Sequence, residues 1–203
     1  MQANHSSFLT FIFNLISLLG NTVTVVIWAV FYLIMVRNKL RVIVHLLFLV
    51  ISIEGVAMMK QMYQGARPFW TSNRVGLLEW SCPLDFGNPS GHTTVVIILY
   101  EPFISDVIGT GHKKWRIIIW ALMVGFVMTS RMYLGAHSLD QVLLGCLFGL
   151  SCLILYKYAF QKYTYLLFQD ILSKYQKSFY FILNTLIFGF ILTLPILIYL
   201  INA

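Results

Sequence analysis

Runs of apolar residues about as long as a bilayer is thick constrain the fold of this chain more than any other feature. Six such segments can be read, at residues 8–36, 42–59, 90–102, 115–129, 139–158 and 179–200. A helix needs about 20 mostly apolar residues to cross the hydrocarbon core of a membrane. Because lipid offers no water to the backbone N–H and C=O groups, each segment is expected to be helical. We therefore predict an all-α, polytopic transmembrane helical bundle with about six spans.

The composition agrees with a membrane protein and excludes several other classes. Hydrophobic residues make up 59% of the chain and charged residues only 10%, and the mean hydropathy is +0.81. The net charge of +7 comes from short basic clusters between apolar runs. This arrangement suits loops at an anionic membrane surface, so membrane lipids and not nucleic acid are the expected partners. Three cysteines without a C-x-x-C or Cys/His spacing predict neither a zinc site nor a disulfide framework.

We interpret the chain as a single domain over residues 1–203, with its motif-bearing core at about 40–160. Gly20-Asn21 interrupts the first apolar segment, which is either one long helix or a half-helix followed by a span. The mixed stretch at 157–177 is amphipathic enough to lie on the membrane surface, and with the last span it forms an extra region at 161–203. Gly145-x-x-x-Gly149 permits close helix packing in the fifth segment.

The distribution of Lys and Arg over the connecting loops predicts the orientation. With one crossing for each segment, one side of the membrane holds Arg37, Lys39, Arg41, Lys113, Lys114, Arg116, Lys157, Lys162, Lys174 and Lys177. The other side holds Lys60, Arg67, Arg74 and Arg131. We expect the first side to be cytoplasmic and the long loop at 60–89 to face the lumen or exterior. The membrane would be an endomembrane, such as the ER, or a bacterial inner membrane.

Three short motifs fall on the side that is poor in positive charge. They are Lys60-x6-Arg67-Pro68, Pro89-Ser90-Gly91-His92, and Ser130-Arg131-x5-His137 with Asp140 beyond it. Lys60, Arg67 and Arg131 supply three cations, and an arginine fork can bind two phosphate oxygens at once. The predicted topology depends on hydropathy and charge and not on the motifs. That it places all three motifs at one membrane face is therefore independent support for a phosphate site.

The remaining motif residues suit the same chemistry. Ser90 and Gly91 open a helix after a proline, and the free N–H groups of a helix N-terminus bind anions. Gly91 removes the side chain that would hinder close approach of the backbone. His137 and Asp140 are three residues apart, so on a helix they share a face and the carboxylate can orient the imidazole. His92 supplies a second imidazole.

Together these motifs resemble the K-x6-R-P, P-S-G-H and S-R-x5-H-x3-D signatures of the type 2 phosphatidic acid phosphatase (PAP2)/haloperoxidase superfamily. We match every signature position, with Asp140 taken as the aspartate. The resemblance implies that His137 attacks phosphorus and becomes phosphohistidine while Asp140 holds its ring. It implies that His92 protonates the leaving group. The residues implied to bind the phosphoryl oxygens are Lys60, Arg67, Ser90, Gly91 and Arg131.

The expected function is that of a metal-independent membrane phosphatase without a cofactor. Its substrate is expected to be a lipid phosphate or diphosphate, because a site at the membrane face suits a head group in water with its tail in lipid. Phosphatidate-like, sphingoid-base and polyprenyl substrates all fit, and so does a soluble sugar phosphate. The alternative is a structural or lipid-binding accessory subunit of a larger membrane complex that retains a phosphate pocket. A vanadate-dependent haloperoxidase is disfavoured by the membrane setting.

Several polar residues fall outside the motifs. Arg74, Glu79 and Asp85 lie in the long loop, where we interpret them as solvated or loop-bracing residues rather than substrate contacts. Glu54 lies inside the second segment, where a carboxylate is costly. It either braces the cationic site or makes a polar contact between helices. His45, in the same segment, is interpreted as a hydrogen-bonding residue between packed helices.

Overall fold

The computed structural model describes residues 6–80, 82–171, 173 and 186, and in this part of the chain every regular element is a helix. The α-helices are α1 (Ser7–Ser17), α2 (Thr22–Met35), α3 (Lys39–Tyr63), α4 (Pro68–Thr71), α5 (Gly91–Ile108), α6 (Lys113–Tyr133) and α7 (Leu139–Leu155). Two 3-10 turns, η1 (Leu18–Gly20) and η2 (Thr110–His112), connect α1 to α2 and α5 to α6. A π-helical turn, η3 (Tyr156–Phe160), follows α7 and leads into further helix at 161–171. The all-α prediction is confirmed.

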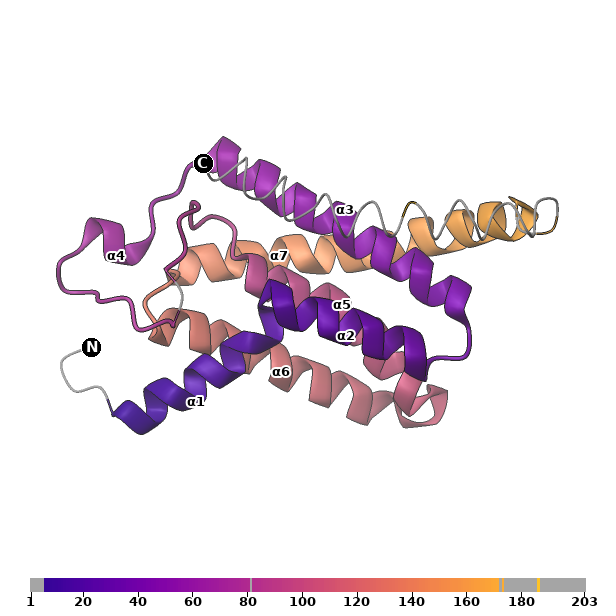
Figure 1. Cartoon of the computed structure of the whole chain (residues 1–203), viewed down its shortest axis with the longest axis horizontal. Coiled ribbons are helices and arrows are strands. Elements are labelled where there is room, and N and C mark those ends of the chain that lie inside the picture. The colour runs from indigo at the N-terminus through magenta and orange to yellow at the C-terminus, as the bar shows by residue number, and fades with distance from the viewer. Residues whose placement is uncertain (1–5, 81, 172, 174–185, 187–203) are drawn as a thin grey trace.

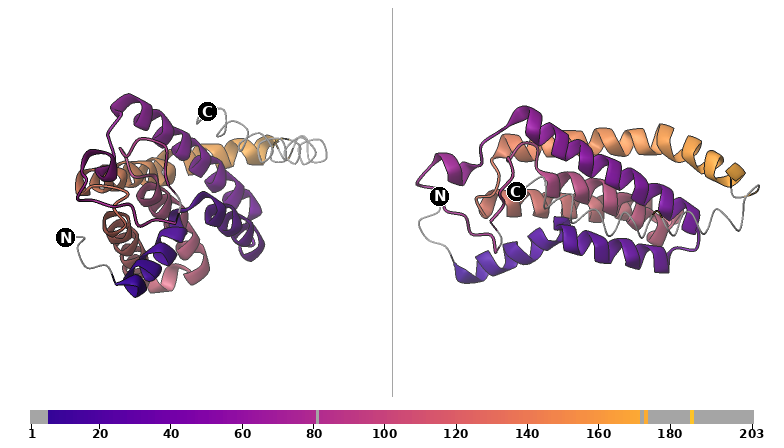
Figure 2. Two further views of the ribbon diagram at one scale, coloured as in Figure 1. Left: turned by 60° about the vertical axis from the view of Figure 1, so that its left-hand side comes forward. Right: turned by 45° about the horizontal axis from the view of Figure 1, so that its top comes forward.

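Helix α5 lies at the centre of the bundle and packs against α3, α6 and α7, which run beside it (Figures 1 and 2). Its residues from Thr93 to Tyr100 are buried all round the helix. The outer helices instead leave large apolar side chains exposed, such as Ile117 on α6 and Leu147 on α7. Exposed apolar faces around a buried helix are what a bundle presents to lipid.

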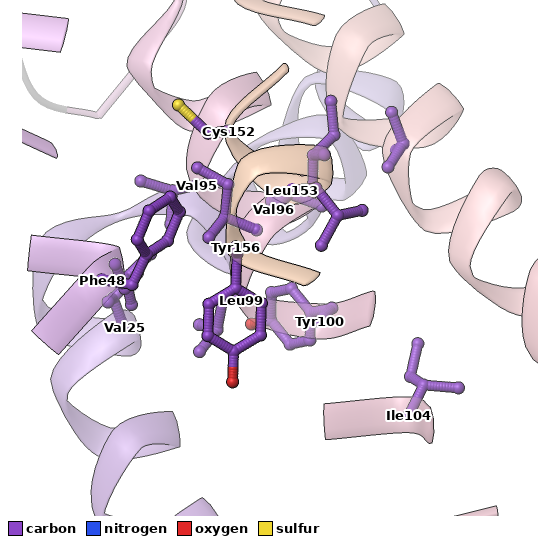
Figure 3. Packing of buried hydrophobic residues seen from close by; sticks show 14 of the residues in the cluster. Val25, Phe48, Val95, Val96, Leu99, Tyr100, Ile104, Cys152, Leu153 and Tyr156 are labelled. Carbon is purple, nitrogen blue, oxygen red and sulfur yellow. The ribbon is translucent and has the colours of Figure 1, made fainter. Parts of the chain in front are cut away.

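The core is built where α5 meets the end of α7 and the middle of α3. Figure 3 shows Phe48, Val95, Leu99 and Tyr156 packed together, from three different helices. Lipid tails are as apolar as these side chains, so the hydrophobic effect does not drive the helices together. Close packing instead stabilises the bundle through van der Waals contacts.

The first apolar segment is one pass through the bundle, broken near its middle. Helices α1 and α2 meet at Gly20-Asn21 with a bend of 55°. Asn21 caps α2, because its side-chain oxygen accepts a hydrogen bond from the Val23 N–H at 3.0 Å. Helix α1 begins at the end of the bundle that carries α4, and α2 finishes at the opposite end (Figure 1). The predicted single long helix is therefore not observed, and the prediction of a half-helix followed by a span stays open, because α2 alone is shorter than a span.

The predicted number of six spans is not confirmed. Three helical stretches in the described residues are long and apolar enough to cross a membrane: Lys39–Thr71, Lys113–Tyr133 and Leu139–Ile171. The bent α1–α2 pair gives a fourth if it counts as one span. Helix α5 is not among them, because polar residues that include His92, Glu101 and Asp106 lower its mean hydropathy. The predicted last span, at 179–200, lies outside the described residues apart from position 186.

Two predicted boundaries are wrong. The third segment was expected to fade near Pro102, but α5 continues through this proline to Ile108. A proline has no N–H for the carbonyl four residues earlier, which here belongs to Ile98. The His45 Nε2–H donates to that carbonyl at 2.9 Å, so its hydrogen bond is made by a neighbouring helix instead. This contact also confirms the interpretation of His45 as a residue that hydrogen-bonds between helices.

The second wrong boundary is the predicted surface segment at 157–177. Its described part continues α7 through η3 as one helix as far as Ile171, the last residue before a gap in the description (Figure 1). This part is therefore continuous with the fifth apolar segment and does not form a separate surface helix. Residues 174–177 lie outside the described part.

The two glycines of the Gly145-x-x-x-Gly149 motif bring α7 into backbone contact with α5, as predicted. A Cβ atom on Gly145 would lie 2.6 Å from the Ser90 carbonyl oxygen, and one on Gly149 would lie 3.2 Å from the Thr94 Cα. Thr94 donates a hydrogen bond to the Gly145 carbonyl at 2.9 Å. The N-terminus of α5 is therefore held against α7.

We expect Gly145→Ala to destabilise the protein, because the added methyl group would push Ser90 and the start of α5 away from α7. Overpacking of this kind typically costs about 1–3 kcal/mol. The measurement is the midpoint of thermal unfolding in detergent. Gly125→Ala on α6 is the control, since a Cβ atom there has no neighbour within 4 Å. A midpoint for Gly145→Ala equal to that of Gly125→Ala would show that the close approach is not needed.

Candidate active site

All three sequence motifs meet at one end of the bundle, where helices begin or end. Lys60 lies in the last turn of α3, Arg67 precedes α4, and Ser90 is the N-cap of α5. Arg131 lies in the last turn of α6, and His137 lies in the short connection to α7. The loop at 64–90 runs over this end and contributes further residues to the cluster (Figure 1).

Lys60 and Arg67 share one carboxylate, that of Asp85. Lys60 Nζ forms an ion pair with Oδ2 of Asp85, and Arg67 Nη2 forms one with Oδ1. The Arg67 Nε–H also donates to the Asp85 backbone carbonyl at 2.7 Å. The two cations are buried, whereas the Asp85 side chain is 39% exposed. An exposed carboxylate therefore sits on two cations that the sequence assigned to phosphate.

Arg67 also links the first motif to the third. Its Nη1 donates to the Ala136 carbonyl at 2.9 Å and lies 3.2 Å from His137 Nε2. The nucleophile predicted from sequence is therefore in direct contact with a predicted phosphate-binding arginine.

A backbone carbonyl determines which nitrogen of His137 carries the proton. His137 Nδ1 lies 2.8 Å from the Gly87 carbonyl oxygen, which can only accept a hydrogen bond. Nδ1 is therefore the protonated nitrogen, and Nε2 presents a lone pair that accepts the hydrogen bond from Arg67. A neutral imidazole with its lone pair on Nε2 can act as a nucleophile through that nitrogen.

The surroundings keep His137 neutral and Asp85 charged. Burial lowers the pKa of His137 well below its usual range, and the charges of Arg131, Arg67 and Lys60 lower it further. For Asp85, burial acts to raise the pKa, but Lys60 and Arg67 outweigh burial and hold the pKa below its usual range. The same cations therefore favour an unprotonated imidazole and an ionised carboxylate.

Arg131 is held by a second loop carboxylate. Its Nη1 and Nη2 both contact the carboxylate of Glu79, with Nη2 at 2.9 Å from Oε2. Nη1 also donates to the Ser17 hydroxyl at 2.6 Å. The Arg131 Nε–H is buried and has no hydrogen-bond partner in the described structure.

The start of α5 supplies the third component of the cluster. Ser90 is fully buried, and its N–H donates to the Gln141 carbonyl at 3.0 Å. The Thr93 hydroxyl donates to the Ser90 hydroxyl at 3.1 Å. Burial lowers the pKa of His92 well below its usual range, and the charges of Arg131, Lys60 and Arg67 lower it further. The His92 Nε2 is buried and has no hydrogen-bond partner among the described residues.

The structure corrects the role predicted for Asp140. Its side chain is exposed, and His137 Nδ1 bonds to the Gly87 carbonyl instead of a carboxylate. The signature also calls for the aspartate four residues after the histidine, and that position here is Gln141. A three-residue spacing would bring Asp140 near the ring only if both lay on one helix, but α7 begins at Leu139, after His137.

Gln141 occupies the place expected for the aspartate and braces the loops around His137. It is buried, its Oε1 accepts from the Ser138 N–H at 3.2 Å, and its Nε2 donates to the Ala66 carbonyl at 2.7 Å. A Cβ atom on Gly87 would lie 2.5 Å from Gln141 Oε1, so the carbonyl that fixes His137 depends on a glycine next to this amide.

Other polar residues differ from their predicted roles in instructive ways. Glu79 and Asp85, expected to be solvated or loop-bracing, neutralise the site cations. The sequence did contain a signal for this role. The motifs supply three cations and no carboxylate to pair with them, and buried cations need partners of opposite charge, which the acidic residues of the loop can provide. Arg74 is exposed, as expected. Glu54 is exposed and has no hydrogen bond or ion pair to any described residue, so it does not brace the site.

Comparison with known proteins places the chain in a family. The sequence profile of the PAP2 superfamily matches residues 41–165. Among solved structures, a transmembrane PAP2 type phosphatidylglycerolphosphate phosphatase from Bacillus subtilis is similar, with a TM-score of 0.64 and 23% identity over 77% of this chain and 78% of that one. LpxE from Aquifex aeolicus has a TM-score of 0.61 and 24% identity, over 76% of this chain and 88% of that one. The comparison with curated proteins gives no match.

The fold is that of a helical membrane protein, and its helix ends carry a cluster of three cations and two histidines. The profile match covers more than half of the chain. The chain therefore belongs to the PAP2 superfamily, and we class it as an integral membrane phosphatase of the PAP2 type.

We predict that His137 titrates below the ordinary histidine pKa of about 6.5. A lowered pKa means that the ring loses its proton at lower pH, so the neutral form persists into mildly acidic solution. The measurement is an NMR titration of histidine-labelled protein, with the signal assigned from its absence in His137→Gln. A His137 midpoint at or above the ordinary histidine value of about 6.5 would contradict the burial and charge described above.

We predict opposite outcomes for the neighbours Asp140 and Gln141. Asp140→Asn, at an exposed position, should change the free energy of unfolding by less than about 0.5 kcal/mol. Gln141→Leu leaves the Ser138 N–H and the Ala66 carbonyl unpaired, at a cost of about 1–3 kcal/mol for each buried group. Thermal unfolding and phosphate release are measured for both variants. Loss of phosphate release in Asp140→Asn but not in Gln141→Leu would restore the carboxylate to the role that the sequence suggested.

Proposed function

We propose that the protein hydrolyses a lipid phosphate or diphosphate through a phosphohistidine intermediate, without a metal ion. The observation that carries the proposal is the state of His137. Its Nδ1–H donates to the Gly87 carbonyl, so the lone pair of the neutral ring lies on Nε2 and faces Arg67. Three cations near one nucleophile suit a reaction that builds negative charge on phosphoryl oxygens.

In the first step, His137 Nε2 attacks phosphorus. An N–P bond forms while the bond from phosphorus to the leaving oxygen breaks. His92 takes up a proton when the bound anionic substrate offsets the charges of the cations, and its Nε2 donates that proton to the leaving oxygen. Lys60, Arg67 and Arg131 bind the phosphoryl oxygens, with backbone N–H groups at the start of α5 as further donors. The Gly87 carbonyl stabilises the positive charge that develops on the imidazole.

In the second step, a water molecule attacks the phosphohistidine. His92, now without its proton, accepts one from the water as the new O–P bond forms and the N–P bond breaks. Inorganic phosphate leaves, His137 returns to its neutral form, and His92 is protonated again. Protons and phosphoryl groups therefore balance over the two steps with water as the only co-reactant.

Asp85 has to give way to the substrate. In the structure its carboxylate forms ion pairs with Lys60 and Arg67. A phosphate that binds these two cations would take the place of the carboxylate oxygens. Asp85 is the most exposed member of the ion pairs described at this end of the bundle, so water can solvate it when it moves.

A lipid substrate suits the position of the site. The cluster lies at the ends of helices whose outer faces are apolar, so a head group can reach it while the tail stays beside the bundle. The Bacillus subtilis neighbour, described as a phosphatidylglycerolphosphate phosphatase, supports a substrate of this kind. The scarcity of Lys and Arg on this side supports an extracytoplasmic face, in an endomembrane or a bacterial inner membrane.

The test is phosphate release by the detergent-purified protein in EDTA, across phosphatidate, phosphatidylglycerolphosphate, a sphingoid-base phosphate, a polyprenyl diphosphate and glucose 6-phosphate. We expect release from at least one lipid phosphate, with His137→Ala reducing turnover by about 10³-fold or more, since loss of a nucleophile removes the whole covalent path. The control variant is His112→Ala, at the exposed turn on the opposite end.

The outcomes separate the parts of the proposal. Quench of the active protein in alkaline detergent should trap a base-stable, acid-labile phosphoenzyme that His137→Ala lacks. Release that EDTA abolishes would contradict the metal-free mechanism, and turnover retained in His137→Ala would contradict the nucleophile. No release from any substrate, with protein shown to be folded, would favour an accessory subunit that keeps a phosphate pocket.

A further inference from the structure

The N-terminal segment Ser7–Gly20, formed by α1 and η1, contacts the candidate active site although it lies outside both the motifs and the profile match at 41–165. Polar side chains are costly on a helix that faces lipid. On α1, the buried positions are Asn14 and Ser17, with 2% and 4% of their surfaces exposed. Asn14 bonds to the backbone of the loop at 64–90, and Ser17 bonds to Arg131. The polar face of α1 is therefore in contact with the candidate active site.

Ser17 contacts a site cation directly. Its hydroxyl accepts from Arg131 Nη1 at 2.6 Å, beside the Glu79 carboxylate that contacts both Nη atoms. One residue earlier in α6, the Ser130 hydroxyl donates to the Phe13 carbonyl of α1 at 2.9 Å. The end of α6 that carries Arg131 is therefore fastened to α1 by a side chain on each helix.

Asn14 fixes the backbone on both sides of Glu79. Its Nδ2 donates to the Leu78 carbonyl at 3.0 Å, and its Oδ1 accepts from the Trp80 N–H at 3.0 Å. Glu79 lies between these two anchored residues, so its carboxylate can hold Arg131 in only a narrow range of positions. A buried amide that pairs with both flanks of one loop residue is a specific clamp, because an apolar side chain of the same size can make neither bond.

Gly20 brings the same segment against the predicted proton donor. A Cβ atom on Gly20 would lie 2.7 Å from the His92 Cβ and 2.8 Å from its Cα. Only glycine allows η1 to lie so close to the His92 backbone. The Tyr100 hydroxyl donates to the Leu19 carbonyl at 3.1 Å and holds η1 on α5.

We propose that α1 is a functional part of the phosphate site, in which Asn14 and Ser17 are positioning residues for Arg131. Ser17 acts by direct contact and Asn14 acts through Glu79. Ser17 and the Glu79 carboxylate that Asn14 positions accept the hydrogen bonds of both Nη atoms of Arg131. The buried Nε–H of Arg131, which has no partner in the described structure, then remains as the donor for a phosphoryl oxygen. This inference rests on the proposed function, since it assigns Arg131 to phosphate.

The test compares Asn14→Leu with Leu15→Ala in the purified full-length protein. Asn14→Leu keeps the volume of the side chain but removes both hydrogen bonds to the Glu79 loop. Leu15 is the next residue of α1, and its side chain is 42% exposed, so its truncation controls for general damage to the helix. Two quantities are measured: KM and kcat for the best lipid phosphate, and the rise in the thermal unfolding midpoint that inorganic phosphate or orthovanadate produces.

We expect Asn14→Leu to raise KM about tenfold, which corresponds to about 1.4 kcal/mol of lost binding. The change in kcat should be smaller, and the stabilisation by phosphate or vanadate should be reduced in the same variant. Leu15→Ala should keep both the KM and the stabilisation of the wild type. If Asn14→Leu and Leu15→Ala have equal KM values and equal stabilisation, the positioning role is overturned.

A second pair of variants keeps the proposal testable if Asn14→Leu does not fold. Ser17→Ala removes the hydroxyl that accepts from Arg131, whereas Ser17→Thr retains it. A raised KM in Ser17→Ala that Ser17→Thr restores supports the proposal. Equal behaviour of the two folded variants contradicts it, since a role in packing alone would not depend on the hydroxyl.

Stabilisation by phosphate separates this inference from the proposed function, because it needs no turnover. Wild-type protein that is stabilised by phosphate but releases none from any substrate would contradict the phosphatase and leave the positioning role to be judged by Asn14→Leu alone. Loss of stabilisation in that variant would then support the role, and retained stabilisation would overturn it.

Discussion

Three buried cations at one end of a helical bundle are the constraint on which the rest of this site depends. A charge taken out of water is strongly destabilised unless a partner of opposite sign accompanies it. The motifs contain no carboxylate that fulfils this need, and the loop at 64–90 supplies two. Asp85 neutralises Lys60 and Arg67, and Glu79 neutralises Arg131. The long loop is therefore an electrostatic counterpart of the site as well as a connection between helices.

The bundle places these charges by the way its helices pack on α5. Gly145 lets α7 contact the Ser90 backbone, so that the start of α5 and the loop that carries His137 lie next to one another. At the opposite end, Asp106 accepts from the Tyr32 hydroxyl at 2.7 Å and pairs with Arg41 at 3.0 Å. Polar contacts thus tie α5 to its neighbours at both ends, while apolar packing holds the middle (Figure 3).

Much of the fold could be predicted from sequence, because lipid restricts a spanning chain to helices and because apolar runs mark where they lie. The meeting of Lys60, Arg67, His92, Arg131 and His137 at one end also follows from the alternating direction of consecutive spans. The course of α5 past Pro102 could not be predicted, since it depends on His45 from a different helix. The same holds for the helix after Tyr156, whose amphipathic pattern is equally compatible with a surface position and with an extension of α7.

The sequence alone determined the chemical type of the site, because short motifs with fixed spacing contain its cations, its two histidines and the glycine at the start of α5. The partners of those residues were decided only by the tertiary structure. The Gly87 carbonyl orients His137, and Gln141 takes the place expected for a carboxylate. Ser17 contacts Arg131 from more than a hundred residues away, and Asn14 contacts the backbone on both sides of Glu79. Such contacts depend on which backbone atoms and side chains meet after the helices pack, and no local pattern encodes that meeting.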